Sequence, residues 1–444
     1  MIYLFIGDIM YDAKTYDVSK DLEVNKIIDT NELSSYSVVT YYSLIKQFTQ
    51  SIGKSYADIV HEVKELQRDK IVGNEIIRYN PNDSLINDYI HQYISYLKGR
   101  NNKRSTINLK VRQMLVILKK SNIEVPKIAV KKEATQKKVQ LITTNDIRFV
   151  LDNCNIHHQA LITFMASTGV RRHDAIHTFK IEDFIEACSD YTDAVFLDDF
   201  LDEAKDNMVP YFEFVPHKTK KTGLPCKVCC SNESANLIIR SLKLRLKSIE
   251  KHNKTYNDNL KLDEESPLFT SKKRSYVGKY NDRSISDIFL NKNKLLKAHK
   301  EKLLDNDLKN HKISKKEWRV KKENIPAFHP HALRYRFIST LRAYTTNRDI
   351  SLLMEGHASS IATDKFYVGE SEELFNKESI KKSYSQVMPY LTFFQNIDPV
   401  TYIKEKEENN ILQEKIDTLE RKINEVEEMK EYLRENSVLN NFDE

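Results

Sequence analysis

The chain has 444 residues and a formal net charge of +6, and its length leaves room for two or three domains that each bury a core. The tail 401–444 holds 7 Lys/Arg against 13 Asp/Glu, so residues 1–400 carry a net charge of +12, which favours a polyanionic partner. Only 9 glycines occur and no glycine-rich nucleotide-binding motif is present, which argues against a nucleotide-binding fold. No apolar run approaches membrane-spanning length, and the first eight residues are too short for a secretory signal, so we expect a soluble cytoplasmic protein.

Three of the five cysteines lie close together within residues 225–230. A zinc site would need a second pair at a suitable spacing, and none follows in the sequence. We therefore expect these cysteines to be apolar strand residues in a reducing cytosol, and we expect no metal site.

The N-terminal half is expected to form a small helical bundle. Residues 1–30 show no clear helical stripe, and a short strand followed by a polar loop is the expected conformation there. Four apolar stripes with helical spacing follow between residues 33 and 122, separated by turns near residues 53, 80–83 and 99. The loop before the fourth stripe and the stripe itself carry seven cations, which fit either a solvated face or a DNA contact: Arg100, Lys103, Arg104, Lys110, Arg112, Lys119 and Lys120.

A lysine-rich stretch without a helical stripe, residues 123–142, is the expected linker to a second region. There, Thr143 is the predicted cap of a new helix, and residues 160–166 predict a buried one. Gly169 follows and permits a tight turn that would aim Arg171 off the next helix start, where Asp174 is placed to hold its guanidinium.

Two strands are predicted further on, at residues 209–216 and 226–230, after an aspartate-rich stretch (187–208) that we expect to be a surface insertion. The connection between the strands carries three lysines, Lys218, Lys220 and Lys221. Residues 291–326 are highly charged, with 12 Lys/Arg against 4 Asp/Glu from Lys292 to Lys322. This stretch predicts a basic helical segment, which is either a DNA-backbone contact or a solvated face.

The stretch 329–367 carries the most informative side chains. His331 and Arg334 share one turn of an expected helix, and His357 and Tyr367 follow. Imidazoles, a guanidinium and a phenol without carboxylates or thiols do not make a metal site. They do make a clamp for a phosphodiester with a hydroxyl nucleophile nearby.

These boxes resemble those of the tyrosine recombinase (phage-type integrase) family. The matching features, in order, are T-G-h-R-x-x-D ending at Asp174, K-T-G at Lys221, H-x-x-R from His331, G-H at His357, and Tyr367. The resemblance covers roughly residues 33–395. It departs from the family in having Tyr335 where many members have a second histidine, and in a long gap between the two arginine boxes.

The resemblance implies that Arg171 and Arg334 stabilise the charge on a phosphate and that a hairpin lysine is the general acid. Lys221 fits the family form best, although Lys218 and Lys220 lie on the same connection.

It further implies that His331 assists proton removal from Tyr367, that His357 hydrogen-bonds a non-bridging oxygen, and that Tyr367 becomes esterified to a DNA 3′-phosphate. Tyr344, Tyr384 and Tyr390 are nearby rivals for the nucleophile. The reaction would need no metal and no cofactor.

The C-terminal region holds two expected association elements. Residues 387–394 are apolar and suited to docking on a neighbouring subunit. Beyond them, Leu412, Leu419, Val426 and Leu433 repeat every seven residues, which predicts a coiled-coil seam that pairs subunits or folds back on its own chain.

The expected fold is mainly α with a small β-sheet (α+β). Its expected parts are an N-terminal extension (1–32), a helical core-binding domain (33–122), a basic linker (123–142), a catalytic domain (143–398) and a C-terminal coiled-coil helix (399–444). The expected function is site-specific DNA recombination for a viral or mobile element by a DNA-bound homotetramer at the nucleoid, with accessory DNA-bending proteins as further partners. The alternatives are a type IB topoisomerase-like relaxing enzyme and a catalytically inactive, architectural DNA-binding protein.

Overall fold

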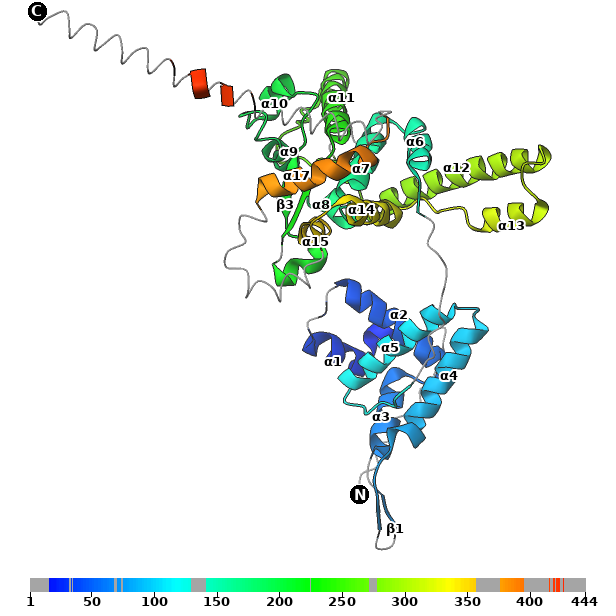
Figure 1. Cartoon of the computed structure of the whole chain (residues 1–444). Coiled ribbons are helices and arrows are strands. Elements are labelled where there is room, and N and C mark those ends of the chain that lie inside the picture. Colours follow the sequence, from blue (N-terminus) through cyan, green and yellow to red (C-terminus); the bar gives the residue numbers. More distant parts are fainter. Residues whose placement is uncertain are drawn as a thin grey trace, which may run out of the picture. The chain divides into compact units, whose positions relative to one another are not determined.

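The computed structural model describes residues 16–31, 33, 35–67, 70–72, 75–128, 141–223, 225–270, 278–356 and 376–394, with isolated positions between 415 and 426. The chain divides into two compact units, Met1–Lys137 and Lys138–Glu444 (Figure 1). Each unit has an apolar core of its own.

The first unit is a helical bundle with one short hairpin. Its described elements are α1 (Leu22–Thr30), α2 (Ser35–Ile52), α3 (Tyr56–Leu66), β1 (Lys70–Val72) paired antiparallel with β2 (Glu75–Ile77), α4 (Leu85–Gly99) and α5 (Arg104–Lys120). The four predicted apolar stripes become the buried faces of α2 to α5, so the predicted helices are confirmed. Phe48 and Tyr93 meet edge to face at the centre, with ring centroids 5.4 Å apart.

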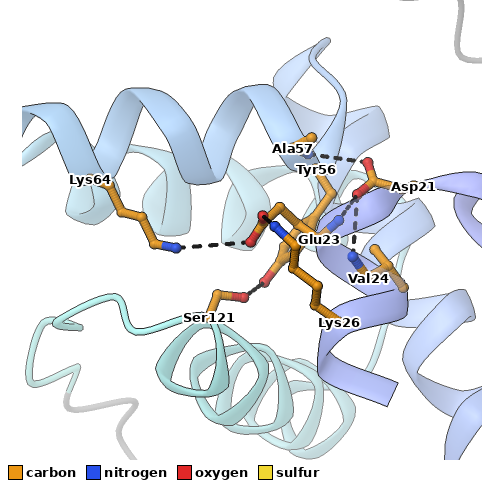
Figure 2. Close-up of polar contacts among 8 residues, drawn as sticks. All are labelled: Asp21, Glu23, Val24, Lys26, Tyr56, Ala57, Lys64 and Ser121. Atoms are coloured by element: carbon orange, nitrogen blue, oxygen red, sulfur yellow. Dashed lines mark hydrogen bonds and ion pairs between the residues drawn. The ribbon is translucent and has the colours of Figure 1, made fainter. Parts of the chain in front are cut away.

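The segment before α2 is largely helical, with η1 (Val18–Lys20) and α1, so the prediction of a strand and a polar loop is wrong for the described residues 16–30. Val18, Val24 and Ile27 are buried in the core of the bundle. The side chain of Asp21 fixes the position of this short helix. One of its carboxylate oxygens accepts hydrogen bonds from two N–H groups of α1. The other accepts from the N–H of Ala57 at the start of α3, at 3.1 Å (Figure 2). One side chain thus caps two helices, a tertiary contact that apolar periodicity does not reveal.

A second contact in Figure 2 ties α3 to the end of α5. The hydroxyl of Tyr56 lies 2.8 Å from the hydroxyl of Ser121, and burial raises the pKa of this phenol well above its usual value. Tyr56 therefore stays neutral and hydrogen-bonded inside the bundle. Through Asp21 and Tyr56, the elements α1, α3 and α5 are held as one body.

The second unit is built around α7 and contains most of the remaining elements. They are α6 (Thr144–Asp152), α7 (Ile156–Thr168), α8 (Arg172–His177), α9 (Ile181–Ala187), α10 (Leu197–Glu203), β3 (Tyr211–Phe214), β4 (Cys226–Cys229), α11 (Asn232–Tyr256), α12 (Asp282–Lys309), α13 (Lys315–Glu323), α14 (Pro330–Tyr344), α15 (Arg348–Met354) and α17 (Lys377–Val387). Residues 160–168 of α7 are all buried, because α7 packs against both α11 and α14. A helix that is apolar all round is expected at such a central position.

The predicted hairpin is confirmed, and with it the mainly helical fold with a small β-sheet. Strands β3 and β4 pair antiparallel, with Tyr211 opposite Cys229 and Phe214 opposite Cys226. The strand cysteines are buried free thiols, as expected. The connection between the strands is a 3₁₀ segment, η3 (His217–Thr222), rather than a tight two-residue turn.

The expectation of a surface insertion at residues 187–208 is wrong for most of its apolar side chains, although Val195 and Phe196 are exposed. Leu197, Phe200, Leu201 and Met208 are buried in the same core as α7. The aspartates of this stretch are exposed, which is why the composition suggested a surface loop. Short helices of seven residues leave too little apolar periodicity for their buried face to be recognised.

Residues 387–394, which the sequence suggested for docking on a neighbour, dock on their own chain instead. Leu391 and Phe393 are fully buried, and the Glu233 carboxylate of α11 accepts from the backbone N–H groups of Phe393 (2.8 Å) and Phe394 (3.1 Å). Of the predicted coiled-coil seam, Leu412 and Leu433 lie outside the described residues, whereas Leu419 and Val426 are helical and exposed. Among the helices that the structure describes, none is both long and apolar enough to cross a membrane.

We expect Asp21→Ala to lower the free energy of unfolding of the first unit by about 2 kcal/mol, taking ~1 kcal/mol for each lost helix cap. The measurement is urea unfolding of the full chain followed by circular dichroism. Asp29→Ala, an exposed aspartate on the same helix, is the matched control and should leave the midpoint unchanged. Equal effects of the two variants would contradict the double-cap role of Asp21.

Candidate phosphodiester site

The first arginine box is a sharp turn between α7 and α8. Gly169 ends α7 in the left-handed conformation (φ 63°), and Arg171 is the extended residue that caps α8. A Cβ at Gly169 would lie 2.1 Å from the Phe337 ring of α14, so only glycine fits. The turn leaves the side chain of Arg171 half-buried at the start of α8.

Arg334 of α14 joins this turn to the end of α15. One of its terminal nitrogens donates to the Gly169 carbonyl oxygen at 2.6 Å, and the other donates to the Glu355 carbonyl oxygen. The side chain is 5% exposed. A guanidinium has five N–H groups. Among the described residues Arg334 uses two of them in these bonds, which leaves three for an anion.

Arg171 and Arg334 lie close enough to interact electrostatically. Burial, and next the positive charge of Arg171, lower the pKa of Arg334 to about 10. Arg334 is still protonated at neutral pH, so two positive charges share one place. Both also act on the thiol of Cys226 in β4, although burial dominates there and raises its pKa to about 12.

The nearby carboxylates already have other partners. Asp174 is 1% exposed and accepts from the backbone N–H of His217 at 2.9 Å; no ion pair joins it to Arg171 among the described residues, contrary to the sequence-based expectation. The Glu355 carboxylate receives two hydrogen bonds from Arg342, at 2.8 and 2.7 Å. The positive charge of the two arginines is therefore only partly compensated.

His331 lies on the first turn of α14, exposed and one turn before Arg334. The imidazole of His329 caps this helix by accepting from the Ala332 N–H at 3.1 Å, and burial lowers its pKa. A neutral His329 is what an accepting cap requires. The helix start thus presents His331 on the same side as Arg334.

For Lys221, which the sequence predicts as the general acid, the structure describes only the backbone. Lys221 lies in η3, whose first residue, His217, is hydrogen-bonded to Asp174 of the first arginine box. Lys218 and Lys220 of the same segment are exposed. His357 and Tyr367 lie outside the described residues.

Sequence reasoning missed two features of this site. The rings of His177 and His217 flank that of His173, at centroid distances of 4.6 and 4.2 Å. Only the i, i+4 spacing of His173 and His177 signalled part of this group. The Arg342–Glu355 pair had no sequence signal. No group of side chains suited to a metal ion occurs in the part of the chain that is described.

We expect Gly169→Ala to lower the free energy of unfolding of the second unit by roughly 2–5 kcal/mol, because backbone strain adds to the clash with Phe337. Gly223→Ala is the matched control: it has nearly the same φ (64°), and nothing lies within 4 Å of its added Cβ. Gly223→Ala should lower the free energy of unfolding by only the backbone strain, about 1–2 kcal/mol. Urea unfolding of both variants separates the two effects, and equal losses would exclude the clash.

No protein-family model matches the sequence, and no curated protein matches it either. Among solved structures, the chain is similar to the XerA recombinase, with 16% identity and a TM-score of 0.27 over 84% of this chain and 98% of the other. It is similar to the Tn1549 transposon integrase in complex with circular intermediate DNA, with 13% identity and a TM-score of 0.41 over 81% and 98%. It is also similar to the XerH site-specific recombinase bound to its difH substrate, with 13% identity and a TM-score of 0.38 over 84% and 93%. The solved structures that it resembles are thus recombinases and integrases, at scores too low for the likeness to carry an argument about chemistry.

Proposed function

We propose that this chain is a site-specific DNA recombinase that cuts and rejoins strands through a 3′-phosphotyrosine at Tyr367. The observation that carries the proposal is the meeting of Arg171 and Arg334, from boxes far apart in sequence, with the nearest carboxylates engaged elsewhere. Two like charges held together are costly unless an anion lies between them. A phosphodiester is an anion whose charge two forked guanidiniums match.

In the proposed cleavage, the Tyr367 oxygen attacks phosphorus and the bond to the 5′-oxygen breaks. His331 takes up the phenol proton, Lys221 protonates the leaving 5′-oxygen, and His357 donates to a non-bridging oxygen. The arginines stabilise the charge that develops on the phosphate. Attack by a 5′-hydroxyl reverses each step, so the phosphotyrosine keeps the bond energy and rejoining needs neither metal nor nucleotide.

The rival tyrosines have surroundings that support Tyr367. Tyr384 is fully buried, its hydroxyl donates to the Ser167 carbonyl oxygen at 2.9 Å, and burial raises its pKa well above the usual value. The rings of Tyr344 and Tyr390 stack face to face, 3.7 Å apart. A nucleophile must lose its proton and approach a phosphate, which the burial of Tyr384 does not favour; Tyr344 and Tyr390 are tested by substitution below.

In this proposal the first unit binds the DNA backbone. Its α5 helix and the preceding loop carry exposed cations, among them Arg100, Lys103, Arg104 and Arg112. We assign residues 33–122 to DNA backbone binding and 143–398 to catalysis, with tetramers acting on two paired sites of a viral or mobile element.

Tyr367→Phe should abolish the covalent adduct with a nicked suicide duplex while DNA affinity stays within a few fold. The duplex carries the junction sequences that flank the coding element, the buffer contains EDTA, and the adduct is detected as a shifted band on a denaturing gel. Tyr344→Phe and Tyr390→Phe are the controls and should form adduct normally. Adduct formation by Tyr367→Phe would assign the nucleophile to another residue.

Arg171→Lys should lower the rate of cleavage by about 10²- to 10³-fold, as expected for the loss of a preorganised charge-stabilising donor. Binding of the same duplex should change little, because a positive charge remains. Single-turnover cleavage kinetics measure the effect, and Arg240→Lys on the exposed face of α11 is the matched control. A parallel loss of binding and cleavage would point to a binding role alone.

A further inference from the structure

The second unit carries a helical hairpin that the proposed cleavage chemistry does not use. Helices α12 and α13 run side by side and extend away from α6 and α14 (Figure 1). Only three residues of α12 are buried, all in its first half or at its middle, and α13 has no buried residue. The hairpin, residues 282–323, is here called the arm.

The root of the arm is bonded to the first arginine box and to the segment that leads into α14. Arg172, which follows the phosphate-site arginine in sequence, donates to the Ser286 hydroxyl at 2.9 Å and pairs with Asp282 at 3.2 Å. On the return side, the Phe328 N–H donates to the Asn293 side chain at 2.8 Å, just before α14 begins. A duplex held at the phosphate site therefore lies beside the root of the arm.

The arm is also held rigid along its length. His299 of α12 stacks on Phe149 of α6, with ring centroids 3.8 Å apart, and Lys300 pairs with Asp146 at 2.5 Å. Further out, the indole N–H of Trp318 on α13 donates to the Asp305 carboxylate on α12 at 2.9 Å. Cations on a rigid support lose little entropy when they bind.

The exposed surface of the arm is predominantly positive, since exposed lysines and arginines outnumber its exposed acidic residues, which are Asp282, Asp287, Glu317 and Glu323. Several of its acidic groups have partners within the arm: Glu301 pairs with Lys322 at 3.9 Å, Asp305 accepts from Trp318, and Glu317 caps its own helix. The exposed cations are Arg283, Lys294, Lys297, Lys302, Lys309, Lys312, Lys315, Lys316, Arg319 and Lys321. Ten exposed cations on so narrow an element repel one another, and a row of phosphates would relieve that repulsion.

We propose that the arm binds the phosphate backbone of double-stranded DNA next to the segment held by Arg171 and Arg334. The inference rests on the proposed recombinase function. Eight of the ten exposed cations are lysines, which bind phosphates as point charges. The one tryptophan is half-buried with its indole already hydrogen-bonded, so the arm lacks the stacking surface that single strands need.

The test compares two variants of the full chain with equal charge changes. In the arm variant, Lys309, Lys315, Lys316 and Arg319 are changed to Gln. In the control variant, four lysines of α11 are changed to Gln: Lys243, Lys247, Lys251 and Lys254. Binding to fluorescein-labelled mixed-sequence duplexes of 20 and 50 base pairs is measured from 50 to 300 mM NaCl. The arm variant should lose affinity for the longer duplex, and its salt slope should fall by about 0.9 for each phosphate that the arm no longer neutralises.

The outcomes separate this inference from the proposed function. If the arm variant keeps the wild-type salt slope, or if the α11 variant loses as much affinity, the arm does not bind DNA. Neither result would contradict DNA binding by the rest of the chain. A wild type that binds neither duplex would overturn both. Trp318 is the only tryptophan of the chain, so its fluorescence reports on the wild-type arm even where a variant fails to fold. Its emission should change with the 50-base-pair duplex; a response to poly-glutamate alone would assign the arm to an acidic protein.

Discussion

The structure of the site depends on one buried cation. The guanidinium of Arg334 donates to the carbonyl oxygens of Gly169 and Glu355, so a single side chain joins the end of α7 to the end of α15. Burying a charged group is costly, and here its hydrogen bonds only partly offset the cost, since burial and Arg171 both lower its pKa. Arg245 is a second buried arginine that donates to two carbonyl oxygens, but Arg334 differs from it in having a second guanidinium, Arg171, close by.

The surroundings of that cation explain why it is not neutralised. The Glu355 carboxylate is fully buried, yet it is turned to Arg342, and Asp174 is turned to the backbone of His217. Both carboxylates therefore brace segments of the site instead of pairing with its arginines. Asp174 in particular connects the turn that carries Arg171 to the start of the lysine segment η3. The two positive charges and the lysine segment are thus positioned by one set of contacts.

Sequence reasoning reached much of the fold and part of the site. Long amphipathic helices such as α2 and α4, and the β3–β4 hairpin, follow from periodicity and are confirmed. Arg171 and Arg334 could be identified because their boxes are short motifs with local turns, and the packing of α14 on α7 then brings the two boxes together. The helix α1 was missed because its cap, Asp21, is shared with α3, and the Arg342–Glu355 pair was missed because it forms only once α15 is packed. Tertiary contacts of this kind produce no periodic pattern of apolar residues in the sequence.

The stretch 187–208 shows how such contacts bear on the proposed nucleophile. Asp190 pairs with both Lys377 and Lys381 of α17, the helix through which the chain returns after residue 375. Lys381 also lies over the Tyr191 ring, with its ammonium 5.0 Å from the centroid. Tyr384 and Phe393 are fully buried and attach α17 and the residues after it to the core of the second unit. The aspartate-rich stretch therefore helps to hold α17, which follows the segment that contains Tyr367. On the other side of that segment, Arg334 and Arg342 hold Glu355.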